Sequence, residues 1–145
     1  MKNTAPILPL LALLILTNHS QAADPQRSFD SMQELVPASG VTGGLVVHLA
    51  DGNGDATADL FSNDHFVVHG LYRNRDAVGP ARQQIKQKKL YGKVSVQHWD
   101  HSHLPYTDNL VNLLVAEGLG DVPVTEVLRV LAPNGTAFVK SGGTW

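Results

Sequence analysis

A glycine-rich turn holds the first residues of this sequence whose types and spacing could do chemistry. The apolar run 45–49 stops abruptly before Gly52 and Gly54, and the segment after them is rich in alanine and aspartate. This order predicts a strand, a glycine loop and a helix. In an open α/β sheet the ligand lies at the carboxyl end of such a strand, where the backbone can approach it and the helix N-terminus offers free N–H groups. Glycines at this spacing also occur in ordinary turns, so that alternative stays open here.

The same turn carries oxygen-bearing side chains that could hold a cation. Their spacing is similar to that of the ligands in calcium loops, and a hard cation favours carboxylate and amide oxygens. Ala56 stands where such a loop needs a glycine, however, and Ser62 stands where an EF-hand places a glutamate. The alternative is a solvated acidic cluster at the start of a helix, and we predict no metal. The residues concerned are Asp51, Asn53, Asp55 and Asp59.

The histidines suggest a second metal site that the pattern does not complete. His98, His101 and His103 surround Trp99 and Asp100, but no cysteine and no second histidine motif accompanies them. We therefore expect a loop with exposed histidines.

Two further histidines, His48 and His69, lie inside apolar runs, and we predict them to be satisfied core or cleft residues rather than catalytic bases. The sequence has no nucleophile elbow of the Gly-x-Ser-x-Gly type, and no catalytic residue is assigned.

The elements that must position these residues alternate along the chain. Apolar runs of strand length occur at five places, and segments with helical spacing precede or separate them. A strand, helix, strand order in so short a sequence implies parallel pairing, and the whole pattern predicts an α/β fold with a doubly wound, mostly parallel sheet in three layers. We predict strands at 45–49, 65–71, 93–98, 110–116 and 136–140, and helices at 28–36, 55–61, 76–90 and 125–131.

The first 22 residues are typical of a signal peptide. Lys2 is followed by the apolar segment 7–16, and Ser20 and Ala22 are the small residues that a signal peptidase needs. An apolar segment of ten residues is too short to cross a bilayer, which takes roughly 20. We therefore predict cleavage after Ala22, export to the periplasm or the extracellular space, and no membrane span in the mature domain 23–145.

Composition limits the possible partners. The chain of 145 residues carries 11 Lys and Arg against 13 Asp and Glu, and it has no cysteine. No basic stripe with interleaved aromatic residues occurs, so we expect no nucleic-acid partner. Without disulfides, stability must come from one hydrophobic core.

Residues 43–140 resemble the class I S-adenosylmethionine-dependent methyltransferases, in particular the type 11-like domains. Four landmarks carry this resemblance in the family's order: the glycine loop 49–54, the strand end Gly70-Leu71-Tyr72, the pair Trp99-Asp100 followed by Leu104-Pro105-Tyr106, and the segment 126–135, Glu-Val-Leu-Arg-Val-Leu-Ala-Pro-Asn-Gly. The resemblance implies a Rossmann-like methyltransferase fold and S-adenosylmethionine as cofactor.

The resemblance also implies a set of cofactor-binding positions. Gly52 and Gly54 would let the loop pass close to the methionine part, Asp100 would accept a hydrogen bond from the adenine amino group, and Trp99 would lie beside the adenine ring. Ala50 stands where the family has its first loop glycine. Tyr72 stands where an Asp or Glu normally holds the ribose hydroxyls, and a phenol cannot replace that bidentate acceptor. We therefore expect weakened or lost cofactor binding.

Two functions of different class follow from the resemblance. One is a methyltransferase-like enzyme domain with an unknown methyl acceptor. The other is a non-catalytic relic of the fold that serves as a structural or interaction module, with a possible β-propeller domain of the quinoprotein type in the full-length chain. The family sheet has seven strands and this sequence supplies five, so we expect a C-terminally truncated fold, a fragment of a longer protein.

Overall fold

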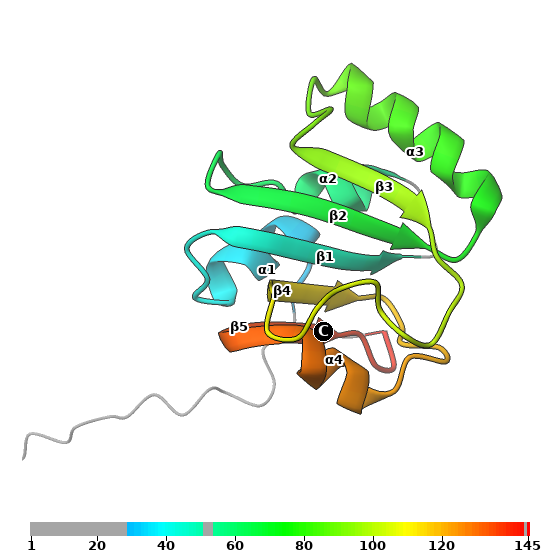
Figure 1. Ribbon diagram of the computed structural model, residues 1–145. Helices are drawn as coiled ribbons and strands as arrows, with labels where there is room; N and C mark the ends of the chain where they lie inside the picture. The colour runs from blue at the N-terminus through cyan, green and yellow to red at the C-terminus, as the bar shows by residue number, and fades with distance from the viewer. Residues whose placement is uncertain (1–28, 51–53, 144) are drawn as a thin grey trace, which may run out of the picture.

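A five-stranded, all-parallel sheet forms the centre of the computed structural model, which describes residues 29–50, 54–143 and 145 (Figure 1). The strand order is β3-β2-β1-β4-β5. The strands are β1 (Gly44–Ala50), β2 (Phe66–Tyr72), β3 (Val94–His98), β4 (Val111–Ala116) and β5 (Leu131–Val139). The helices are α1 (Met32–Ala38), α2 (Gly54–Asp59), α3 (Arg75–Gln87) and α4 (Val124–Val130).

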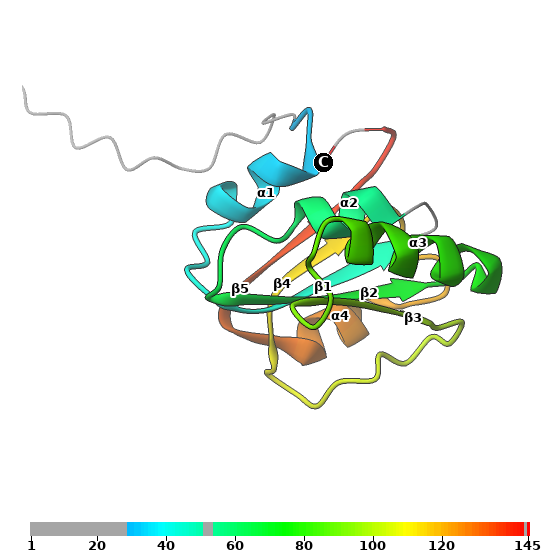
Figure 2. The same cartoon turned by 90° about the horizontal axis from the view of Figure 1, so that it is seen from above.

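The helices divide between the two faces of the sheet. Figure 2 shows α1, α2 and α3 on one face and α4 on the other, where the long connection between β3 and β4 also lies. Each face has its own apolar core. Val46 and Val68 belong to the core under α1 to α3, whereas Val47 and Leu71 belong to the core under α4. Because β1 is buried on both faces, its sequence is apolar except for His48 and does not alternate.

The predicted three-layer α/β fold is confirmed, and most element ends agree to within one or two residues. Three boundaries differ further. The first helix was expected from residue 28, but α1 begins four residues later at Met32, and it continues through Pro37 to Ala38. The third helix was expected to reach Leu90, but α3 ends at Gln87, and Lys89 then takes a positive φ of 58°. The last strand was expected from 136, but β5 begins at Leu131, directly after α4.

One prediction concerns a part of the chain outside the described residues. The proposed signal peptide, residues 1–22, lies there, so its cleavage stays a prediction. Within residues 29–50, 54–143 and 145, no helix is long and apolar enough to cross a membrane.

Candidate functional site

The ends of four strands line up along one edge of the sheet, which we call the carboxyl edge. Ala50 of β1 is in register with Tyr72 of β2, and Tyr72 is in register with His98 of β3. On the other side of β1, Leu49 is in register with Ala116 of β4. The chain leaves β1 toward β2 and later returns to the other side of β1, which makes the gap between β1 and β4 a topological switch point. Open α/β sheets bind ligands at such a point.

The structure places the glycine-loop residues only in part. Gly52 lies outside the described residues, and Gly54 is the first residue of α2. Ala50 ends β1, and its side chain packs into the core under α1 to α3. Only the backbone of Ala50 therefore faces the carboxyl edge.

The Tyr72 side chain is buried between the sheet and α2, where it belongs to a series of hydrogen bonds. The Tyr72 hydroxyl lies 2.6 Å from Thr57 Oγ1, which in turn lies 2.8 Å from His48 Nδ1. All three side chains are fully buried. The prediction that His48 is a core residue is confirmed, although its Nε2 atom has no hydrogen-bond partner among the described residues.

Burial keeps the side chains of His48 and Tyr72 uncharged. It lowers the pKa of His48 from 6.5 to about 4, so the imidazole is neutral at pH 7. Burial also raises the pKa of Tyr72, against the opposing effect of its hydrogen bond with Thr57, and the carboxylates of Glu117 and Asp55 raise it further. The phenol is therefore a neutral, hydrogen-bonded core group.

Gly70 makes room for this arrangement. A Cβ atom at residue 70 would lie 2.8 Å from the Tyr72 ring, 2.8 Å from a Val96 methyl group and 3.0 Å from the Thr57 methyl group. The glycine in the middle of β2 thus allows Tyr72 to fold back against the sheet instead of projecting from the carboxyl edge.

Trp99 and Asp100 lie at this edge, directly after β3. The backbone N–H of Trp99 donates to the Tyr72 carbonyl oxygen over 2.8 Å, and the indole packs against the core under α4. Its Nε1 donor is buried and has no partner among the described residues. Asp100 is more than half exposed, with its carboxylate 3.4 Å from His101 Nε2 and 3.8 Å from His98 Nε2. Asp100 is thus an accessible hydrogen-bond acceptor.

Sequence reasoning missed Arg73, the residue after Tyr72. Its side chain is half-buried, and its Nη2 donates to the carbonyl oxygen of Leu119 in the connection between β4 and α4. The available signal was a cation directly at the end of a predicted strand.

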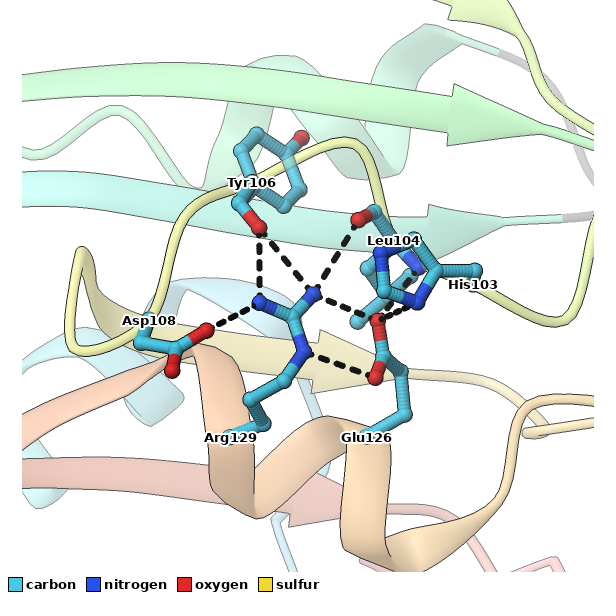
Figure 3. Close-up of polar contacts among 6 residues, drawn as sticks. All are labelled: His103, Leu104, Tyr106, Asp108, Glu126 and Arg129. Carbon is cyan, nitrogen blue, oxygen red and sulfur yellow. Dashed lines mark hydrogen bonds and ion pairs between the residues drawn. The ribbon is translucent and has the colours of Figure 1, made fainter.

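A second missed feature is the ion-pair cluster under the β3 to β4 connection (Figure 3). Arg129 of α4 donates from Nε to Glu126 Oε2 over 2.8 Å and from Nη2 to Glu126 Oε1 over 2.6 Å. Its Nη1 also donates to Asp108 over 2.6 Å, and both terminal nitrogens donate to the Tyr106 carbonyl oxygen over 3.0 Å. Glu126 accepts from the Leu104 backbone N–H over 2.8 Å. The cluster therefore holds the connection against α4.

The charges of this cluster stabilise each other. The Arg129 guanidinium, opposed by desolvation and helped by the Leu104 N–H, lowers the pKa of Glu126 to about 2. The two carboxylates raise the pKa of Arg129 further above its ordinary value. The landmark Glu126-Val-Leu-Arg129 thus has a structural role, which is to position the segment that follows Trp99 and Asp100.

Another contact fixes the same connection to the sheet. The Tyr106 hydroxyl lies 2.8 Å from His69 Nδ1 on β2, and the two rings meet edge to face. Burial lowers the pKa of His69 and raises that of Tyr106. His69 is therefore a paired residue beneath the connection, as predicted.

The described residues do not assemble a metal site. In this part of the chain no three His, Asp or Glu side chains are grouped so as to hold an ion. His103 contacts Glu126 over 3.0 Å, apart from the pair formed by His98 and His101 with Asp100. Of the suggested calcium ligands, Asp51 and Asn53 lie outside the described residues, and Asp55 and Asp59 both bind Lys88 Nζ, over 3.2 and 3.1 Å.

Comparison with known proteins yields one fold. No family model matches the chain. The demethylmenaquinone methyltransferase of Lactobacillus johnsonii is 31% identical over 101 residues, which are 64% of this chain and 41% of that protein. The chain thus spans about two fifths of the length of this curated relative.

Two solved structures give the same result. A putative S-adenosyl-L-methionine-dependent methyltransferase from Methanococcus maripaludis superposes with a TM-score of 0.66 at 19% identity, over 74% of this chain and 52% of that one. A geranyl diphosphate methyltransferase in complex with SAM superposes with a TM-score of 0.65 at 15% identity, over 74% and 46%. The chain therefore has the Rossmann-like fold of class I methyltransferases, and it spans about half of these structures.

Proposed function

We propose that this chain is a methyltransferase-like domain that binds S-adenosylmethionine at the carboxyl edge. The observation that carries the proposal is the position of Asp100, an exposed carboxylate just after β3 and next to Trp99, whose indole N–H has no partner among the described residues. The described methyltransferase neighbours, one of them in complex with SAM, support the same cofactor.

The residues at this edge fit the cofactor in part. Asp100 would accept a hydrogen bond from the adenine amino group, Trp99 would border the adenine ring, and Gly52 and Gly54 would border the methionine part. The bound cofactor would supply an activated methyl group, and the chain would hold and orient it, since methyl transfer depends mainly on positioning.

The ribose position is the weak part of the fit. Tyr72 cannot accept hydrogen bonds from a ribose in place of an acid, because its hydroxyl bonds Thr57 inside the core. The loss of one charge-assisted hydrogen bond, roughly 1.5–3 kcal/mol, corresponds to about a tenfold or greater loss of affinity. We therefore propose weak binding of the cofactor.

The buried Tyr72 also favours a second candidate function. A fold that has replaced its ribose acceptor with a core residue is suited to serve as a non-catalytic structural or interaction module. In this second proposal the module belongs to an exported protein with the signal peptide 1–22, and a β-propeller domain would be its neighbour in a longer chain.

Titration calorimetry with S-adenosylmethionine and S-adenosylhomocysteine tests both proposals. For the enzyme-like site we expect binding that Asp100→Ala weakens at least about tenfold. The exposed Asp64→Ala is the matched control, because it makes the same charge change just before the start of β2, at the opposite edge of the sheet, and it should leave the affinity unchanged. No binding to the native chain, or equal losses in both variants, would overturn the enzyme-like proposal.

A further inference from the structure

Arg73 crosses the switch point of the sheet. It follows the last residue of β2, yet its guanidinium group donates to the Leu119 carbonyl oxygen beyond the end of β4. Because β1 lies between β2 and β4, the side chain must pass over the end of β1. A positive charge therefore lies where an open α/β sheet binds its ligand.

The connection after β4 is shaped to receive this side chain. A Cβ atom at residue 120 would overlap the Arg73 guanidinium group, and Gly120 has a positive φ of 53°. Only a glycine meets both conditions without strain. The position of Arg73 is thus specified from two segments that are distant in the sequence.

Most of the hydrogen-bonding capacity of Arg73 has no partner among the described residues. A guanidinium group has five N–H donors, and among the described residues its one recorded acceptor is the Leu119 carbonyl oxygen, with no carboxylate within ion-pair distance. Directly after the neighbouring strand β3, the buried Trp99 Nε1 is a second donor that has no partner among the described residues. Trp99 and Arg73 each follow one member of the register pair His98 and Tyr72, so both lie at the carboxyl edge.

Charge at the end of the second strand decides which ligand group can bind there. In dinucleotide-binding folds, an acid near this position accepts hydrogen bonds from a ribose hydroxyl, whereas an arginine accommodates a phosphate. Here residue 72 is a buried neutral phenol and residue 73 is an arginine. The edge thus offers donors and positive charge instead of an anionic acceptor.

We infer that Arg73 binds the anionic oxygen group, carboxylate or phosphate, of a small molecule at the carboxyl edge. The guanidinium exchanges the Leu119 carbonyl oxygen for two oxygens of the anion, which match its fork geometry. The inference rests on the proposed function only in placing the ligand at the same edge. It adds that the ligand's anionic group, rather than a ribose diol, is what the end of β2 recognises.

Two pairs of probes test this recognition by calorimetry. S-adenosylhomocysteine and 5′-methylthioadenosine differ in the amino-acid part that carries the carboxylate, and AMP and adenosine differ in the phosphate. In at least one pair we expect the anionic member to bind about tenfold or more tightly. Arg73→Gln should abolish this preference, and Arg73→Lys, which keeps the charge but loses the fork, should retain part of it.

Arg75→Gln is the control, because it removes the same charge from the exposed start of α3. It should keep the preference, and thermal melting of each variant checks that it is folded. A preference that Arg73→Gln and Arg75→Gln change equally, or no preference in either pair, overturns the inference. Binding of S-adenosylhomocysteine that is insensitive to Arg73→Gln, together with no Arg73-dependent preference for AMP over adenosine, would overturn the inference and leave the proposed function standing. Arg73-dependent binding of AMP without binding of S-adenosylhomocysteine would support the inference and overturn the proposed function.

Discussion

Acidification should destabilise this protein through His48. The imidazole is fully buried, and its pKa in the folded state is about 4 against 6.5 for an ordinary histidine. Between these two values the unfolded chain binds a proton that the folded chain does not, so stability is complete above pH 6.5 and falls as the pH is lowered toward 4. A difference of this size, at about 1.4 kcal/mol per pKa unit, corresponds to a loss of roughly 3 kcal/mol.

Urea unfolding followed by circular dichroism between pH 7.5 and pH 4 measures this loss. His48→Gln removes the titrating group and keeps an amide that can hydrogen-bond to Thr57, so the variant should be less stable at pH 7.5 but should lose less stability on acidification. The exposed His65→Gln is the matched control, and its pH profile should follow that of the native chain.

A direct titration of the His48 ring in the native protein provides a second test, which does not depend on whether the His48→Gln variant folds. In NMR spectra of the native protein, the His48 ring carbons should show no protonation shift until the pH approaches 4. A His48 resonance that titrates near pH 6.5 in the folded protein, or identical pH dependence in the native chain and His48→Gln, would refute the reasoning.

Three further predictions concern the packing that supports the carboxyl edge. Gly70→Ala should destabilise the fold by about 1–3 kcal/mol, because the new methyl group meets the Tyr72 ring. Thermal unfolding should show no such loss for the control Gly79→Ala, where the added methyl group meets nothing within 4 Å. Equal losses of stability in the two variants would contradict this account. Thr57→Val should lower the free energy of unfolding, measured in urea, by about 1–3 kcal/mol, since it leaves the buried polar groups of His48 and Tyr72 without their shared partner. An unchanged free energy of unfolding would show that these hydrogen bonds contribute nothing to stability. Glu126→Gln should destabilise the fold by roughly 1.5–3 kcal/mol and should speed hydrogen exchange at residues 99–110. Because the pKa of Glu126 is lowered to about 2, the stabilisation by its carboxylate should be present above pH 4.5 and should be lost as the pH falls toward 2. Unchanged hydrogen exchange at residues 99–110 would contradict the role of Glu126 as an anchor of this connection.

The fold could be predicted because its signals are local. The run 45–49 is apolar except for the buried His48 since β1 is covered on both faces, and a strand of that kind belongs to a parallel sheet. Element ends were less well predicted where packing overrides local preference. Pro37 remains inside α1 because that helix is anchored by Leu35 and Val36, both buried in the core.

The candidate site could be predicted only at the level of strand ends. The sequence placed Ala50, Tyr72 and Trp99 at the ends of neighbouring strands, and the sheet register brings them to one edge. The direction of each side chain was not predictable. Tyr72 turns inward only because Gly70 and Thr57, one on the same strand and one on α2, leave it space and a hydrogen-bond partner.

The sequence by itself determined the order of strands and helices, the parallel sheet and the edge at which a ligand would lie, because these depend on apolar periodicity and on turns between neighbours in the chain. Tertiary structure alone decided which polar groups face that edge. The guanidinium of Arg73 reaches Leu119 across 46 positions of sequence, and Arg129 holds Leu104 and Tyr106 across 25 and 23. Such contacts depend on strand order and on the space that a distant glycine leaves, and neither is encoded in the residues next to the arginine.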